Sequence, residues 1–139
     1  MKHTISNTDQ SFRTQVESCA YPVTDFNHRA HLRLAYIYLS EGTTDEANDR
    51  VRETLTRILI HNKIEPASKY HETLTKAWLM AMNHFMQKTV ATDSADEFIN
   101  KNPIMLDSSI MKTHYSDELL FSELAKKVFV EPDLAPIPG

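Results

Sequence analysis

Apolar side chains recur along this chain at intervals of three and four residues, which is the period of an α-helix, and no segment shows the sustained alternation of a β-strand. The clearest stripe follows Thr24 and Asp25, either of which can cap a helix, and continues to about Ser40. It contains His28, His31, Leu32, Ala35, Tyr38 and Leu39. Gly42 comes next and suits the left-handed conformation at a helix C-terminus. We therefore predict a helix that ends near residue 40.

Two more long helices are expected. One runs from Thr43 to about Asn62, and Thr43 and Glu46 have the spacing of a capping box at its start. The other runs from Ser68, as its N-cap, to about Lys88. The predicted core combines the buried faces of all three long helices: Leu32, Ala35, Leu39, Val51, Leu55, Ile58, Trp78, Met82 and Phe85.

The remaining segments predict shorter elements. Helices are expected over 9–19, 93–102 and 117–128, with prolines interrupting the chain between them. Residues 1–8 are polar and expected to fray, and residues 131–139 contain three prolines and are expected to be extended. We predict an all-α protein: an up-down helical bundle of about four main helices, with short helices and an extended C-terminal tail, in one domain spanning 1–139.

Composition narrows the function classes. The chain has 139 residues, 41% hydrophobic and 24% charged, as in ordinary globular domains. Its net charge is −4 and its Lys and Arg residues form no basic stripe, which argues against nucleic acid as a partner. Cys19 is the single cysteine, so no internal disulfide forms. No apolar run approaches the roughly 20 residues of a membrane span, and the first residues lack an apolar signal region. We expect a cytoplasmic protein with no membrane partner.

Three histidines fall on the predicted apolar stripes. His28 and His31 are three residues apart and therefore share a helix face, and His71 lies near the start of the helix predicted from Ser68. Short connections favour antiparallel neighbours, which places the starts of the first and third long helices at the same end of the bundle. We predict that the three imidazoles line one pocket and that at least two approach within about 5 Å.

This cluster has the ligand types of a metal site. Three histidines and a water suit Zn²⁺, whereas two histidines with the carboxylate of Glu72 suit Fe²⁺ or Mn²⁺. Glu72 is also the candidate general base, or a partner that orients a histidine. In the alternative interpretation the histidines are core groups that bond Asn27, Tyr70, Thr75 or water, and Glu72, about 100° round the helix from His71, is exposed.

Four segments together resemble a family of small bacterial all-helical proteins for which no activity is established. They are FNHRAHLRLA at 26–35, YHETLT at 70–75, Tyr115-Ser116 and FVEPDLAP at 129–136. Ser68-Lys69 stands where that family often has a glycine, so the entry to the following helix is expected to differ. The resemblance implies where a site lies and not which reaction occurs there. Within the closing segment, Glu131 and Asp133 either reach the histidine pocket or pin the tail to helix ends, and we favour pinning.

Three hypotheses for function follow. In the first, His28, His31 and His71 hold a divalent ion (Zn, Fe or Mn) with Glu72 in support, and the protein is an enzyme acting on a small molecule. In the second, the pocket binds a small-molecule ligand without turnover. In the third, a face of the bundle joins a partner and the protein is structural. Fold alone cannot decide among them.

Overall fold

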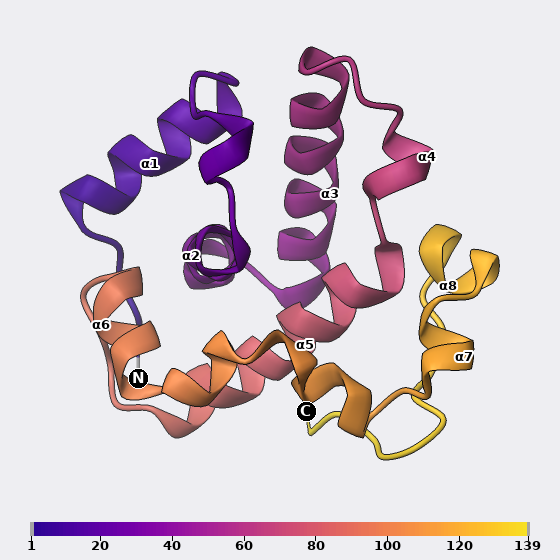
Figure 1. Ribbon diagram of the computed structural model, residues 1–139. Helices are drawn as coiled ribbons and strands as arrows, with labels where there is room; N and C mark the ends of the chain where they lie inside the picture. The colour runs from indigo at the N-terminus through magenta and orange to yellow at the C-terminus, as the bar shows by residue number, and fades with distance from the viewer. Residues whose placement is uncertain (1, 139) are drawn as a thin grey trace.

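The computed structural model describes residues 2–138, and it confirms the predicted all-α helical bundle (Figure 1). Helices account for 68% of the residues, and the described part of the chain contains no strand. Met1 and Gly139, at the outer ends of the predicted frayed start and extended tail, lie outside the described residues. Among residues 2–138 there is no helix with the length and apolar character needed to cross a membrane.

Four helices contain most of the helical residues: α1 (Asn7–Glu17), α2 (His28–Glu41), α3 (Thr44–His61) and α5 (Glu72–Lys88). Shorter helices are α4 (Pro66–Lys69), α6 (Ala95–Lys101), α7 (Asp117–Leu120) and α8 (Glu123–Lys127). The 3₁₀ turns η1 (Val23–Asp25), η2 (Pro103–Leu106) and η3 (Ser108–Thr113) complete the order.

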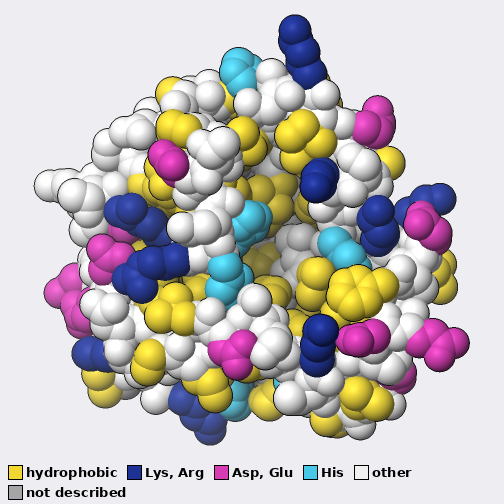
Figure 2. Space-filling view, viewed as in Figure 1, with side chains coloured by type: hydrophobic (Ala, Val, Ile, Leu, Met, Phe, Trp, Pro, Cys, Tyr) yellow, Lys and Arg dark blue, Asp and Glu magenta, His cyan; other side chains and the backbone are white. Residues whose placement is uncertain are grey.

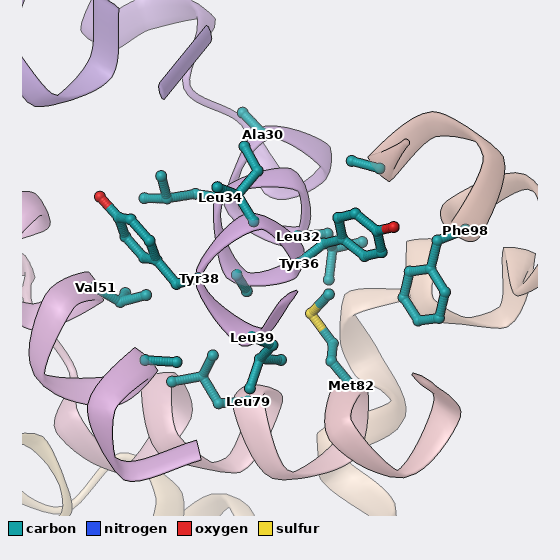
Figure 3. Packing of buried hydrophobic residues seen from close by; sticks show 14 of the residues in the cluster. Ala30, Leu32, Leu34, Tyr36, Tyr38, Leu39, Val51, Leu79, Met82 and Phe98 are labelled. Atoms are coloured by element: carbon teal, nitrogen blue, oxygen red, sulfur yellow. The ribbon is translucent and has the colours of Figure 1, made fainter. Parts of the chain in front are cut away.

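Helix α2 lies at the centre of the bundle. Figure 1 shows it along its axis, with α1, α3, α5 and α6 around it. Every residue from Leu34 to Leu39 is buried, because a helix that is apolar on all sides is stable only when other elements enclose it. The close view in Figure 3 shows Tyr38 on the side of Val51 and Tyr36 on the side of Phe98. The rings of Tyr36 and Phe98 stack with centroids 5.2 Å apart.

The three long helices that short connections were expected to make neighbours do contact one another. Their axes cross, however: α2 runs along the line of sight in Figure 1 while α3 and α5 lie across it. The first turns of α2 and α5 still come to the same region, because His28 and His71 line one cavity.

Helix caps agree with the sequence prediction in one case and differ in two. Thr43 and Glu46 form the predicted capping box. The cap of α2 is Asn27, whose side chain accepts a hydrogen bond from the Ala30 N–H, whereas Thr24 and Asp25 belong to η1. The predicted N-cap of α5 at Ser68 is wrong as well. Pro66–Lys69 forms its own short helix, Tyr70 is extended, and the helix begins after His71.

The chain ends are better ordered than the sequence suggested. His3 is buried, and its Nδ1 and Nε2 lie 2.7 Å from Thr92 Oγ1 and from the Met86 carbonyl oxygen, so the expectation of a frayed start is wrong there. The predicted helix over 117–128 is split into α7 and α8, because Ser122 caps a new helix. Residues 131–138 contain no helix, as predicted.

The tail is pinned, which confirms the favoured interpretation of Asp133. Its carboxylate accepts hydrogen bonds from the N–H and hydroxyl of Ser116, at 2.8 and 2.6 Å. Ser116 is itself the N-cap of α7. His114 binds the Ala135 carbonyl oxygen through Nδ1 at 2.8 Å, so this histidine has a structural role.

The predicted core is largely correct. Six of its members are buried: Leu32, Ala35, Leu39, Val51, Ile58 and Met82. Leu55, Trp78 and Phe85 are only partly buried. Leu55 and Trp78 depart from the prediction because each packs against the core on one side and lines a cavity on the other.

The buried hydroxyl of Tyr36 gives a test of the packing around α2. It donates to the Thr4 carbonyl oxygen at 2.6 Å and lies 2.9 Å from Thr92 Oγ1, so it ties the N-terminal segment to the bundle. Tyr36→Phe should lower the free energy of unfolding by about 1–2 kcal/mol, because buried polar groups lose their partner. Tyr21→Phe is the matched control, since that hydroxyl has no hydrogen-bond partner within residues 2–138. Urea unfolding of both variants is the measurement, and equal effects would contradict the prediction.

Candidate functional site

A cavity of about 910 Å³ opens between α2, α3 and α5 on one side and η3 and α7 on the other. Figure 2 shows this hollow in the face of the molecule, with histidine side chains gathered around it. Most of its lining is apolar, and the residues used below are Leu55, Leu74, Trp78, Met82, Met111 and Leu120. Its volume falls within the range of small-molecule sites, which are mostly apolar with a few placed polar groups.

His28 is the first residue of α2 and lines one side of the cavity. Its Nε2 lies 2.8 Å from the Met105 carbonyl oxygen, and its ring packs edge-on against Trp78 with centroids 4.8 Å apart. A carbonyl oxygen only accepts, so Nε2 carries the proton of this bond. In the neutral ring Nδ1 is then an acceptor, and it has no hydrogen-bond partner among the described residues.

His31 lies one turn further along α2 and presents the opposite nitrogen. Its Nδ1 donates to the Asn27 carbonyl oxygen at 2.9 Å, and its ring lies over Phe26 at 4.3 Å between centroids. The ring is accessible within the hollow, yet protein atoms surround it. Desolvation by these surrounding atoms lowers the pKa of His31, the bond to Asn27 acts in the opposite direction, and the nearby His28 lowers the pKa further. Neutral His31 leaves Nε2 as an acceptor.

His71 uses both of its ring nitrogens within the protein. Nδ1 accepts the Leu74 N–H at 3.1 Å and so caps α5, in the place that a Ser, Thr, Asp or Asn side chain usually takes. Nε2 donates to the Leu120 carbonyl oxygen at 2.7 Å. The imidazole therefore joins the start of α5 to α7 across the edge of the cavity. To bind anything else it has to give up one of these bonds.

All three histidines line the same cavity, in agreement with the sequence prediction. They do not meet at one point, however. Within residues 2–138 no three His, Cys, Asp or Glu side chains form a group that could hold a metal ion. The hydrogen-bond partners expected if the histidines were core groups are partly right. Asn27 does bond His31, through its backbone carbonyl, but the Tyr70 hydroxyl bonds Glu72 and no histidine.

Glu72 is buried and does not line the cavity, so the interpretation of it as an exposed residue is wrong. Arg52 donates to its two oxygens at 3.0 and 2.7 Å, and the Tyr70 hydroxyl and the Asn48 amide donate to them at 2.7 and 3.0 Å. Burial alone raises the pKa of a carboxyl group, but these donors outweigh it and lower the pKa of Glu72 to about 2. A carboxylate that is this well satisfied is a weak base, and its geometry favours a structural role joining α3 to α5.

Several cavity residues carry no recognisable signal in the sequence. Lys69 lies at the end of α4, and Ser108, Ser109 and Lys112 come from the irregular segment around η3. They lie on short elements that lack periodicity, and tertiary packing alone brings them to the histidines. No family model, curated protein or solved structure matches this chain.

The hydrogen-bond donors around Glu72 predict a specific acid sensitivity. Its pKa is about 2 in the folded protein and 4.5 for an ordinary glutamate, so folding favours the charged form. The stabilisation is fully present above pH 4.5 and is lost as the pH falls from 4.5 towards 2. Glu72→Gln should therefore lower stability at pH 7 by about 1–3 kcal/mol and should reduce the loss of stability below pH 4.5.

Urea unfolding at a series of pH values measures both effects. Glu53→Gln is the control, because its exposed pair with Arg57 should contribute less than about 0.5 kcal/mol. An unchanged pH profile in the Glu72 variant would rule out the assigned role.

Proposed function

We propose that this protein is a binding module that holds a small molecule with a largely apolar body in the cavity beside α2. The observation that carries the proposal is the cavity itself, about 910 Å³ in volume and lined mainly by apolar side chains. Leucine and tryptophan side chains that would otherwise be expected in a closed core are left accessible there. Binding an apolar body would remove this surface from water, which is the main source of affinity in such sites.

Polar groups in the cavity support an oriented ligand. His28 Nδ1 and His31 Nε2 are acceptors in the neutral rings, and both rings are held in place by hydrogen bonds to backbone carbonyl groups. A ligand with an O–H or N–H group can donate to either nitrogen. Fixed rings make this recognition efficient, because little side-chain freedom is lost on binding.

Filling the cavity should abolish binding. Leu55 lies on α3 and lines the hollow, so Leu55→Trp places a larger side chain in it. The neutral fluorescent probe N-phenyl-1-naphthylamine should bind the unmodified protein and should lose at least about tenfold in affinity in this variant. Leu124→Trp is the matched control, because Leu124 is 61% exposed and does not line the cavity.

Fluorescence titration is the measurement, and circular dichroism checks that both variants keep their helices. If the unmodified protein does not bind the probe, or if both variants bind it equally, the proposed function fails.

A metal-dependent enzyme acting on a small molecule is the second candidate function. It is favoured by the two unbonded ring nitrogens that His28 and His31 bring to one cavity, since a neutral imidazole nitrogen is also a metal ligand. His71 could join them only after giving up its bond to Leu74 or Leu120. Glu72 would have to leave Arg52, which makes it the least suited of the four predicted residues.

Elemental analysis of untagged protein, purified without chelators, tests this candidate. A bound Zn, Fe or Mn ion should be present at about one per chain and should be lost in His28→Ala and in His31→Ala, because a site with so few protein ligands does not survive the loss of one. His84→Ala is the control and should retain the metal, since His84 does not line the cavity. Metal-free unmodified protein, or retention in all three variants, counts against the enzyme.

A further inference from the structure

The cavity differs in charge from the rest of the molecule. The chain carries 19 Asp and Glu residues against 15 Lys and Arg, yet no acidic residue lines the cavity. Lys69 and Lys112 carry the charge of its lining, and both are positive. A locally basic, mostly apolar hollow in an acidic protein is complementary to a ligand that combines an apolar body with a negative charge.

The two lysines reach the cavity from different elements. Lys69 ends α4, and no carboxylate of residues 2–138 forms an ion pair with it. Lys112 lies in η3, where its Nζ is 3.7 Å from Asp117 Oδ1. Both side chains of that pair are more than half exposed, so water screens the interaction and the charge of Lys112 is only weakly compensated.

The acidic groups nearest the cavity do not line it. The charge of Glu72 is balanced by Arg52, and its oxygens accept hydrogen bonds from Arg52 and Asn48 of α3 and from the Tyr70 hydroxyl. Asp107 is exposed, and it accepts bonds from the N–H and hydroxyl of Ser109 at 3.0 and 2.6 Å. The first turns of α2 and α5, whose dipoles are positive at that end, also border the cavity. Among the residues that line the cavity, the charged side chains are therefore positive.

We propose that the ligand of this cavity is an organic anion, with an apolar aromatic or acyl body that enters the hollow and a carboxylate or similar acidic group that stays near Lys69 and Lys112. This inference rests on the proposed function and specifies its ligand class. The lysines raise affinity for the anion and leave a neutral molecule of the same shape unaffected. Because Lys69 and Lys112 are exposed, their contribution decreases as salt is added.

A matched pair of fluorescent probes separates charge from shape. 8-Anilinonaphthalene-1-sulfonate and N-phenyl-1-naphthylamine share one aromatic skeleton, and only the first carries a negative charge. In the double variant Lys69→Gln/Lys112→Gln the dissociation constant of the sulfonate should rise about five- to tenfold, while that of the neutral probe should change less than about twofold. In the unmodified protein, raising NaCl from about 20 to about 500 mM should weaken binding of the sulfonate and leave binding of the neutral probe unchanged.

The control is Lys101→Gln/Lys127→Gln, which removes the same charge from residues that do not line the cavity. It should leave both probes unchanged within about twofold. The anionic ligand class is overturned, while the binding module stands, if two results are found together. The first is that the cavity-lysine variant changes the dissociation constants of both probes or of neither. The second is that salt changes the binding of both probes equally. If neither probe binds the unmodified protein, or if Leu55→Trp does not displace them, the proposed function itself fails.

Discussion

Burial of α2 on all its sides is the constraint from which the rest of the structure follows. Residues 34–39 have no solvent-facing side, so other helices must enclose that half of α2 completely. The first turn is different, because there His28 and His31 occupy the face that the surrounding helices leave open. One helix thus anchors the core with one half and borders the cavity with the other.

Local rules of sequence predicted the long helices well and their beginnings less well. The period of apolar residues located α2, α3 and α5, and the Thr43–Glu46 capping box was correct because both partners lie within one turn. His71 was missed as a cap because imidazole is rare in that role, and its use here depends on a second bond to Leu120, 49 residues away. The ordered start of the chain depends likewise on His3 reaching residues 86 and 92.

The cavity was predicted only through its histidines, and the reason is physical. Leu55 and Trp78 follow the same helical period as fully buried core residues. The sequence of one helix does not show whether another element packs over such a residue. Whether an apolar face meets another helix or a hollow depends on how α3 and α5 cross α2, and that crossing is decided by packing over the whole molecule. The lysines of the rim come from short irregular elements that carry no periodic signal at all.

The three histidines show why a residue type at a helix start does not define its chemistry. His28, His31 and His71 occupy similar positions, yet the bonds around each ring decide what it can do. His71 donates through Nε2 and accepts through Nδ1, so its hydrogen-bonding capacity is used in holding α5 to α7. His28 and His31 each donate once to a backbone carbonyl, which fixes the tautomer of the neutral ring and leaves the other nitrogen as an acceptor. The pair from α2 therefore offers the free acceptors of the cavity lining, while His71 joins α5 to α7 at its edge.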